Sequence, residues 1–152
     1  HLVAIYGRRR VGKTFLVDQA LSGKITFRHA GLSPVDEAGK KNLMPEQLKH
    51  FYHSLLLQGM PKSHIPTSWL EAFFMLSMHL QNNDTGRRQV VFLDELPWLD
   101  TPRSGFLTAF EGFWNTWACH RDNVMVIVCG SANSWILRQN YTHHQIIPLH
   151  TQ

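Results

Sequence analysis

Along the chain, short runs of continuous hydrophobic residues alternate with segments in which hydrophobic residues recur every three or four positions. The continuous runs predict buried strands, because a strand covered on both faces presents no polar side. They occupy residues 2–6, 25–30, 89–93, 124–129 and 145–149. The periodic segments predict helices, since that spacing places apolar side chains on one helix face. They occupy residues 13–21, 46–58, 67–80, 104–118 and, over a shorter length, 131–138.

The alternation of these elements predicts an α/β fold. A connection that returns through a helix leaves consecutive strands parallel and covers the sheet with helices. We therefore expect a three-layer sandwich with a mostly parallel sheet of about five strands and helices on both faces. Residues 31–45 and 60–66 are expected to be loops, and Thr67 is expected to cap the start of the third helix.

The composition is consistent with one domain that has a substantial core. The 152 residues are 43% hydrophobic, 11% aromatic and only 17% charged, which favours a chain that packs against a partner or another domain. The net charge of +4 permits an anionic partner without requiring nucleic acid. No hydrophobic run approaches the roughly 20 residues of a membrane span. With two cysteines and no disulfide framework, we expect a cytoplasmic protein without membrane contact.

Residues 7–14 carry the most specific motif, Gly-Arg-Arg-Arg-Val-Gly-Lys-Thr, between a predicted strand and a predicted helix. It matches G-x-x-x-x-G-K-[ST], in which the glycines allow a tight turn whose N–H groups surround phosphate oxygens. Lys13 is expected to bind the β- and γ-phosphates of a nucleotide, and the Thr14 hydroxyl to bind Mg²⁺. The predicted nucleotide-binding residues are Gly7, Arg8, Arg9, Arg10, Val11, Gly12, Lys13, Thr14 and Phe15.

A second motif lies at the end of a later strand. The apolar run 90–93 is followed directly by Asp94 and Glu95. An aspartate at this place holds Mg²⁺, usually through water, and the glutamate can orient or deprotonate an attacking water. Many strands end in acids, so this pattern becomes informative only beside the phosphate-binding motif.

A third candidate follows the strand 124–129, whose carboxyl end opens on the same edge of a parallel sheet. Ser131 is the first candidate for a group that senses the γ-phosphate and Asn133 the second, although both could instead cap the following helix. The predicted catalytic residues are Lys13, Glu95 and Ser131. The predicted metal ligands are Thr14 and Asp94.

Other conspicuous residues have simpler explanations. The pairs His143–His144 and His50–His53 have no carboxylate or cysteine beside them that would complete a metal site. The aromatic stripe at 106–117 is expected to be core or a docking face, and Cys119 and Cys129 are both expected to be buried.

Four segments together resemble the archaeal-type ATPase family, which belongs to the STAND branch of AAA+-related P-loop ATPases. They are Tyr6 to Thr14, Phe92 to Leu99 (Phe-Leu-Asp-Glu-Leu-Pro-Trp-Leu), Phe113 to Asn115 (Phe-Trp-Asn) and Cys129 to Ser131 (Cys-Gly-Ser). The resemblance implies ATP binding and hydrolysis on a five-stranded parallel sheet. It also implies that complete members continue into a helical lid, a winged helix and often a nuclease-like domain. Residues 1–152 are therefore expected to be the ATPase core of a longer protein.

Two functions remain open at this point. The first is an ATPase core that uses ATP and Mg²⁺ and acts on a DNA or protein partner through further domains, with oligomerisation possible. The second is a nucleotide-gated interaction module in which ATP orders a switch and hydrolysis is slow or absent. A small-molecule kinase is disfavoured, because the sequence offers no acceptor site with a catalytic acid outside the sheet.

Overall fold

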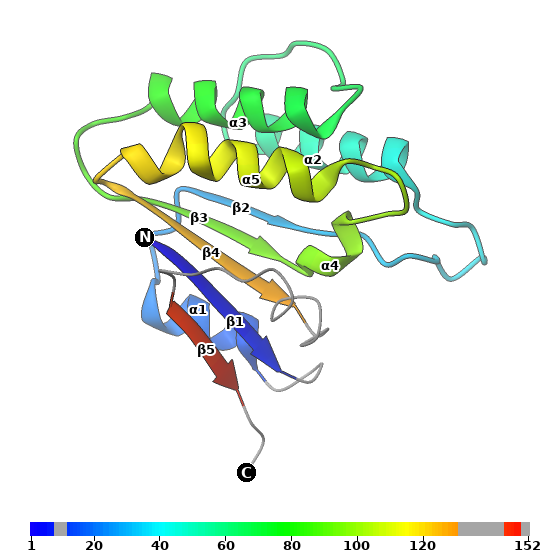
Figure 1. The fold of residues 1–152 in the computed structure, drawn as a ribbon, viewed down its shortest axis with the longest axis horizontal. Helices are drawn as coiled ribbons and strands as arrows, with labels where there is room; N and C mark the ends of the chain where they lie inside the picture. The colour runs from blue at the N-terminus through cyan, green and yellow to red at the C-terminus, as the bar shows by residue number, and fades with distance from the viewer. Residues whose placement is uncertain (8–11, 131–144, 150–152) are drawn as a thin grey trace.

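Five strands form one sheet in the order β2-β3-β4-β1-β5, and every neighbouring pair is parallel (Figure 1). The computed structural model describes residues 1–7, 12–130 and 145–149. The strands are β1 (Leu2–Gly7), β2 (Phe27–Ala30), β3 (Gln89–Asp94), β4 (Val124–Gly130) and β5 (Gln145–Leu149). The parallel five-stranded sheet that the hydrophobic runs predict is confirmed.

Helices cover both faces of the sheet, which confirms the three-layer α/β fold. The described helices are α1 (Lys13–Ala20), α2 (Met44–Leu57), α3 (Trp69–Asn82), α4 (Leu96–Leu99), α5 (Phe106–Thr116) and the short 3-10 helix η1 (Ala118–His120). In Figure 1, α2, α3 and α5 lie on one face and α1 lies on the other. Successive side chains of β1 lie on opposite faces of the sheet and so contribute to both cores. Leu2 and Ala4 pack toward α2, α3 and α5, while Val3 and Ile5 pack toward α1.

Aromatic side chains fill the larger layer, and Phe73 of α3 lies at its centre. The ring centroids nearest to that of Phe73 are 5.2–6.0 Å away and come from α2, α3 and α5. They belong to Phe51, Trp69, Phe106, Phe110 and Phe113. The aromatic stripe at 106–117 therefore contributes its phenylalanines to the core, as expected. Such ring pairs add a little to the free energy gained from burial.

The layer around α1 is much thinner. Val17 is the one hydrophobic residue of this eight-residue helix that is buried, and it packs on strand residues such as Ile5 and Ile127. The predicted helix is confirmed, but Phe15 and Leu16, which suggested it, are exposed.

Three helix starts differ from the prediction, and the simplest case is α5, which begins at Phe106 rather than at 104. Ser68, not Thr67, caps α3, and its hydroxyl accepts a hydrogen bond from the N–H of Glu71 at 3.1 Å. Helix α2 begins at Met44 rather than 46, because Pro45 occupies its first turn, where a missing N–H costs no hydrogen bond. The short α4 was not predicted, since four residues are too few to show a period. The helix predicted at 131–138 lies outside the described residues.

Gln47 of α2 and Gln58, the residue that caps its end, cover the open edge of β2 and the segment that follows it. Gln58 bonds both backbone groups of Arg28, accepting from its N–H at 2.8 Å and donating to its carbonyl at 2.7 Å. Gln47 does the same for Leu32, at 3.0 and 2.9 Å. These amides replace the hydrogen bonds of a missing neighbouring strand, so the edge of the sheet is paired rather than open.

His29 of β2 is buried against α2 and gives the fold a pH dependence. Burial, with a smaller contribution from His50, lowers the pKa of His29 from 6.5 to about 3. Below pH 6.5 the unfolded chain therefore takes up a proton that the folded chain does not. The resulting stability is complete above pH 6.5 and is lost as the pH falls toward 3.

We expect the unfolding free energy to fall by about 2 kcal/mol between pH 6.5 and 5.0 through His29 alone, at about 1.4 kcal/mol per pH unit. Urea unfolding at several pH values measures it. His29→Asn, which cannot titrate and keeps a polar partner for Ser54, should flatten the dependence. The exposed His120→Gln should not, and an equal effect of both changes would contradict the assignment.

Candidate functional site

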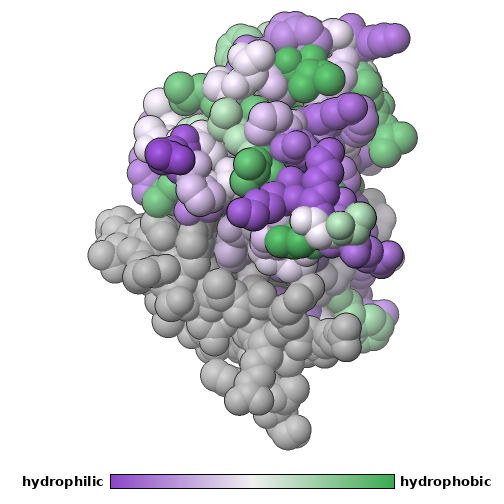
Figure 2. Space-filling view, turned by 90° about the vertical axis from the view of Figure 1, so that its right-hand side faces the viewer, coloured by the Kyte–Doolittle hydropathy of each residue, from purple (hydrophilic) through white to green (hydrophobic). Residues whose placement is uncertain are grey.

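The carboxyl ends of the strands define the candidate site. All strands run the same way, so β1, β3 and β4 end on one edge of the sheet, at Gly7, Asp94 and Gly130. Strand β4 lies between β1 and β3, so its end lies between the two predicted motifs. Figure 2 views the molecule from the side toward which the strands point, where hydrophilic side chains gather with hydrophobic ones scattered among them.

The start of α1 carries the two central residues of the phosphate-binding motif. Gly12 precedes the helix in the left-handed conformation, at φ 86°, which glycine adopts without steric cost. Lys13 is buried at 6% exposure, whereas the next residue, Thr14, is exposed. The helix start thus holds an ammonium group within the fold and presents a hydroxyl at its surface.

Thr14 and Asp94 meet across the site although 80 positions separate them. The Thr14 hydroxyl donates to Oδ2 of Asp94 at 2.6 Å, and Oδ1 of Asp94 accepts from the N–H of Glu95 at 2.8 Å. The structure therefore brings the two predicted metal ligands together. Their role as ligands stays a prediction.

Glu95 follows β3 in an unusual backbone conformation. Its φ is 50°, in the left-handed region that residues with a side chain seldom occupy, and it precedes α4 directly. Its carbonyl accepts from the N–H of Trp98 at 3.0 Å, which closes the first turn of α4. Such a conformation persists where the surroundings fix it. The role of Glu95 in positioning water stays a prediction.

A small cavity of about 160 Å³ adjoins the Thr14–Asp94 contact. Its other walls include Arg28, which pairs with Asp18, and His29, whose Nδ1 lies 2.7 Å from the Ser54 hydroxyl. Sequence reasoning did not identify these residues. The available signal was the presence of arginine and histidine inside a strand that was expected to be apolar.

Cys129, near the end of β4, lies beneath the site. Burial raises the pKa of its thiol strongly, and the negative charge of Asp94 raises it further. The positive charge of Lys13 acts in the opposite direction, and the negative charge of Glu95 adds a smaller upward shift. The charges of Asp94, Lys13 and Glu95 therefore all act on the pKa of this thiol.

Several predicted residues cannot be located. Arg8, Arg9, Arg10, Val11, Ser131 and Asn133 lie outside the described residues. Phe15 is exposed at 67%, on the first turn of α1. Within the described part of the chain, no group of three or more His, Cys, Asp or Glu side chains could hold a metal ion.

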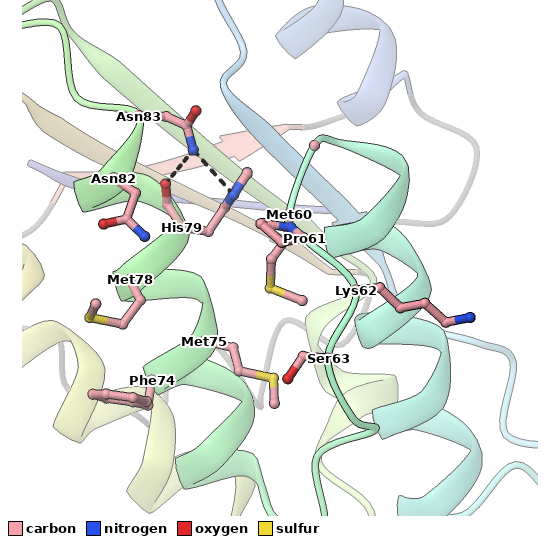
Figure 3. A pocket seen from close by; sticks show the side chains of 11 residues that line it. Met60, Pro61, Lys62, Ser63, Phe74, Met75, Met78, His79, Asn82 and Asn83 are labelled. Atoms are coloured by element: carbon pink, nitrogen blue, oxygen red, sulfur yellow. Dashed lines mark hydrogen bonds between the residues drawn. The ribbon is translucent and has the colours of Figure 1, made fainter.

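A larger hollow of about 400 Å³ lies away from these residues, between α3 and the segment that leads into it (Figure 3). Met60, Met75 and Ser63 face one another there, while Lys62 points away. The Asn83 amide donates to the carbonyl of His79 at 2.7 Å and closes the far end.

Comparisons with known proteins identify the fold. Over 99% of its length the chain superimposes on a Walker-type ATPase of Pyrococcus abyssi, with a TM-score of 0.62 and 18% identity. It also superimposes on a chain of Drosophila ORC bound to DNA, with a TM-score of 0.54, 11% identity and 98% coverage. A structure of Drosophila ORC bound to AT-rich DNA and Cdc6 gives a TM-score of 0.54 at 11% identity, over 99% of this chain and 50% of the other.

These likenesses establish the P-loop ATPase fold, and at such identities they establish no more. The chain covers 49% of the Walker-type ATPase and 80% of the ORC chain bound to DNA. It therefore spans about half the length of the archaeal protein. No protein-family model matches the sequence, and no curated protein is similar to it. None of the described helices is both long and apolar enough to cross a membrane.

The two cysteines should differ in reactivity, because Cys129 is buried while Cys119 is exposed, contrary to the expectation that both are buried. The raised pKa of Cys129 keeps its thiol protonated and unreactive. A disulfide reagent at pH 8 should titrate one thiol in the folded protein and two in urea. Cys119→Ser should abolish the folded-state reaction. Rapid reaction of both thiols in the native protein would contradict the burial of Cys129.

Proposed function

We propose that the chain is the ATP-binding core of an ATPase that hydrolyses ATP with Mg²⁺. The observation that carries this proposal is the 2.6 Å contact between Thr14 and Asp94, on a P-loop ATPase fold. The contact brings together a hydroxyl and a carboxylate from two motifs that lie 80 positions apart in the sequence. Two hard oxygen donors are the chemistry that Mg²⁺ prefers.

Each residue has a distinct task in this proposal. Lys13 binds the β- and γ-phosphates, and its burial excludes water from that contact, which strengthens it. Thr14 and Asp94 would hold the Mg²⁺, which neutralises charge on the phosphate oxygens when it is bound. Glu95 orients the water that attacks the γ-phosphate and accepts its proton. The left-handed backbone conformation of Glu95 turns the chain directly after Asp94. The side chains of Asp94 and Glu95 therefore do not alternate between opposite faces as successive residues of a strand would.

The finer assignments are part of the same proposal. Membership of the STAND branch rests on the sequence resemblance described above. A DNA or protein partner is consistent with the DNA-bound ORC chains that share the fold. A cytoplasmic location agrees with the free, exposed Cys119, which suits a reducing compartment.

Lys13→Ala should weaken ATP binding about 10- to 100-fold or more, because charge-assisted hydrogen bonds to the phosphates are lost. Calorimetric titration with ATP and Mg²⁺ measures the affinity, and GTP in a parallel titration reports the choice of base. Lys24→Ala, which removes an exposed lysine just beyond the same helix, is the matched control. Equal affinity in the wild type and in Lys13→Ala would refute the phosphate-binding assignment.

Glu95→Gln should retain ATP binding and lower kcat by about 10²- to 10⁴-fold, since the amide cannot accept the proton of the attacking water. Phosphate release over time, measured beside the binding titration, separates the two properties. Glu37→Gln, in the exposed loop before α2, is the control. If the wild type binds ATP and releases no phosphate, the protein is the nucleotide-gated module instead.

A further inference from the structure

Gly31, the first residue after β2, lies against the backbone of the two acidic residues. Its N–H donates to the carbonyl of Asp94 at 3.1 Å. A Cβ at this position would lie 2.8 Å from the carbonyl oxygen of Glu95 and 3.2 Å from Cβ of Trp98. A real Cβ does not approach a backbone oxygen so closely, so any side chain here forces β2 and the Asp94–Glu95 segment apart.

Glycine at position 31 is required by this proximity and not by its own backbone. Gly31 is absent from the glycines with positive φ, so an alanine could adopt its conformation. The missing Cβ therefore sets how near the end of β2 can come to the backbone of Glu95.

Gln47 of α2 holds the next residue from the other side. It is fully buried, and its amide accepts from the N–H of Leu32 at 3.0 Å and donates to the carbonyl of Leu32 at 2.9 Å. A buried amide that lost these partners would carry an unpaired polar group at considerable cost, so the two bonds resist separation. They keep the chain beyond β2 from moving outward, away from the acidic residues.

We propose that Gly31 and Gln47 are positioning residues for the Asp94–Glu95 pair. Gly31 allows the end of β2 to lie close to the backbone of Glu95, and Gln47 prevents it from moving away. The backbone that carries both acids therefore has one position relative to Thr14. The left-handed conformation of Glu95 is held by this packing. The inference rests on the proposed ATPase function and names residues outside both motifs.

The test compares two variants with two matched controls. Gly31→Ala adds the clashing methyl group, whereas Gly112→Ala in α5 adds one where no atom lies within 4 Å. Gln47→Met keeps the length of the side chain and removes its hydrogen bonds. Gln58→Met does the same to the equivalent pair of bonds at Arg28, which lies within β2, whereas Leu32 lies beyond its end. Both glutamine variants lose edge pairing, but only Gln47 holds the residue next to Gly31.

Gly31→Ala and Gln47→Met should lower kcat about 10- to 100-fold, because small misplacements of reacting groups have effects of this size. They should also reduce the gain in ATP affinity that Mg²⁺ provides over EDTA, while the affinity in EDTA changes less than about twofold. Both controls should keep the wild-type kcat and Mg²⁺ gain, although Gln58→Met lowers the stability to urea.

An equal loss of kcat in Gln47→Met and Gln58→Met would overturn the proposal, because it would show a general effect of the sheet edge. Wild-type values in both test variants would overturn it as well. If Gly31→Ala does not fold, the pair of glutamine variants decides. If the wild type binds ATP but does not hydrolyse it, the gain in ATP affinity that Mg²⁺ provides over EDTA becomes the deciding measurement. A wild type that binds no ATP overturns the proposed function itself, and this inference with it.

Discussion

The parallel pairing of β4 with both β1 and β3 is the constraint on which the site depends. Because the three strands run in one direction, their carboxyl ends meet at one edge, and residues 80 positions apart come within hydrogen-bond distance. The pairing is stable only if both faces of the sheet are covered, since its central strands are apolar on each side. The aromatic layer of α2, α3 and α5 is therefore a condition for the site.

Helix α2 links the core to the site in a second way. Its apolar face packs into the aromatic layer, while Gln47 and the capping residue Gln58 bond the backbone of Leu32 and Arg28 at the edge of the sheet. The same helix therefore holds the edge strand both by packing on the face of the sheet and by hydrogen bonds at its edge. These bonds hold the end of β2, which matters because the next residue, Gly31, lies against the backbone of Asp94 and Glu95.

The sequence predicted the fold well because its signals are local and repeated. Continuous apolar runs mark the strands, and the helical stripe of α2 is buried as expected at Leu48, Phe51 and Leu55. The contact of Thr14 with Asp94 could be anticipated because the motifs and the common direction of the strands together imply it. Gly31, His29 and Gln47 could not, since their importance arises from contacts between distant elements. The exposed Phe15 and Phe74 show a related limit: hydrophobic spacing identifies a helix but not which of its faces the rest of the molecule covers.

The helices on the two faces of the sheet bury very different amounts of apolar surface, so they differ in how easily they open. Among the described residues, α1 buries one hydrophobic side chain, whereas α3 buries an aromatic and aliphatic face along its whole length. Local opening of α1 therefore exposes little apolar surface and costs far less free energy than opening the opposite layer. The helix that begins with Lys13 and Thr14 is the natural site of fraying, so its amide hydrogens exchange with solvent early. Any ligand held by those two residues would restrain that motion first, and the sheet beneath it would scarcely change.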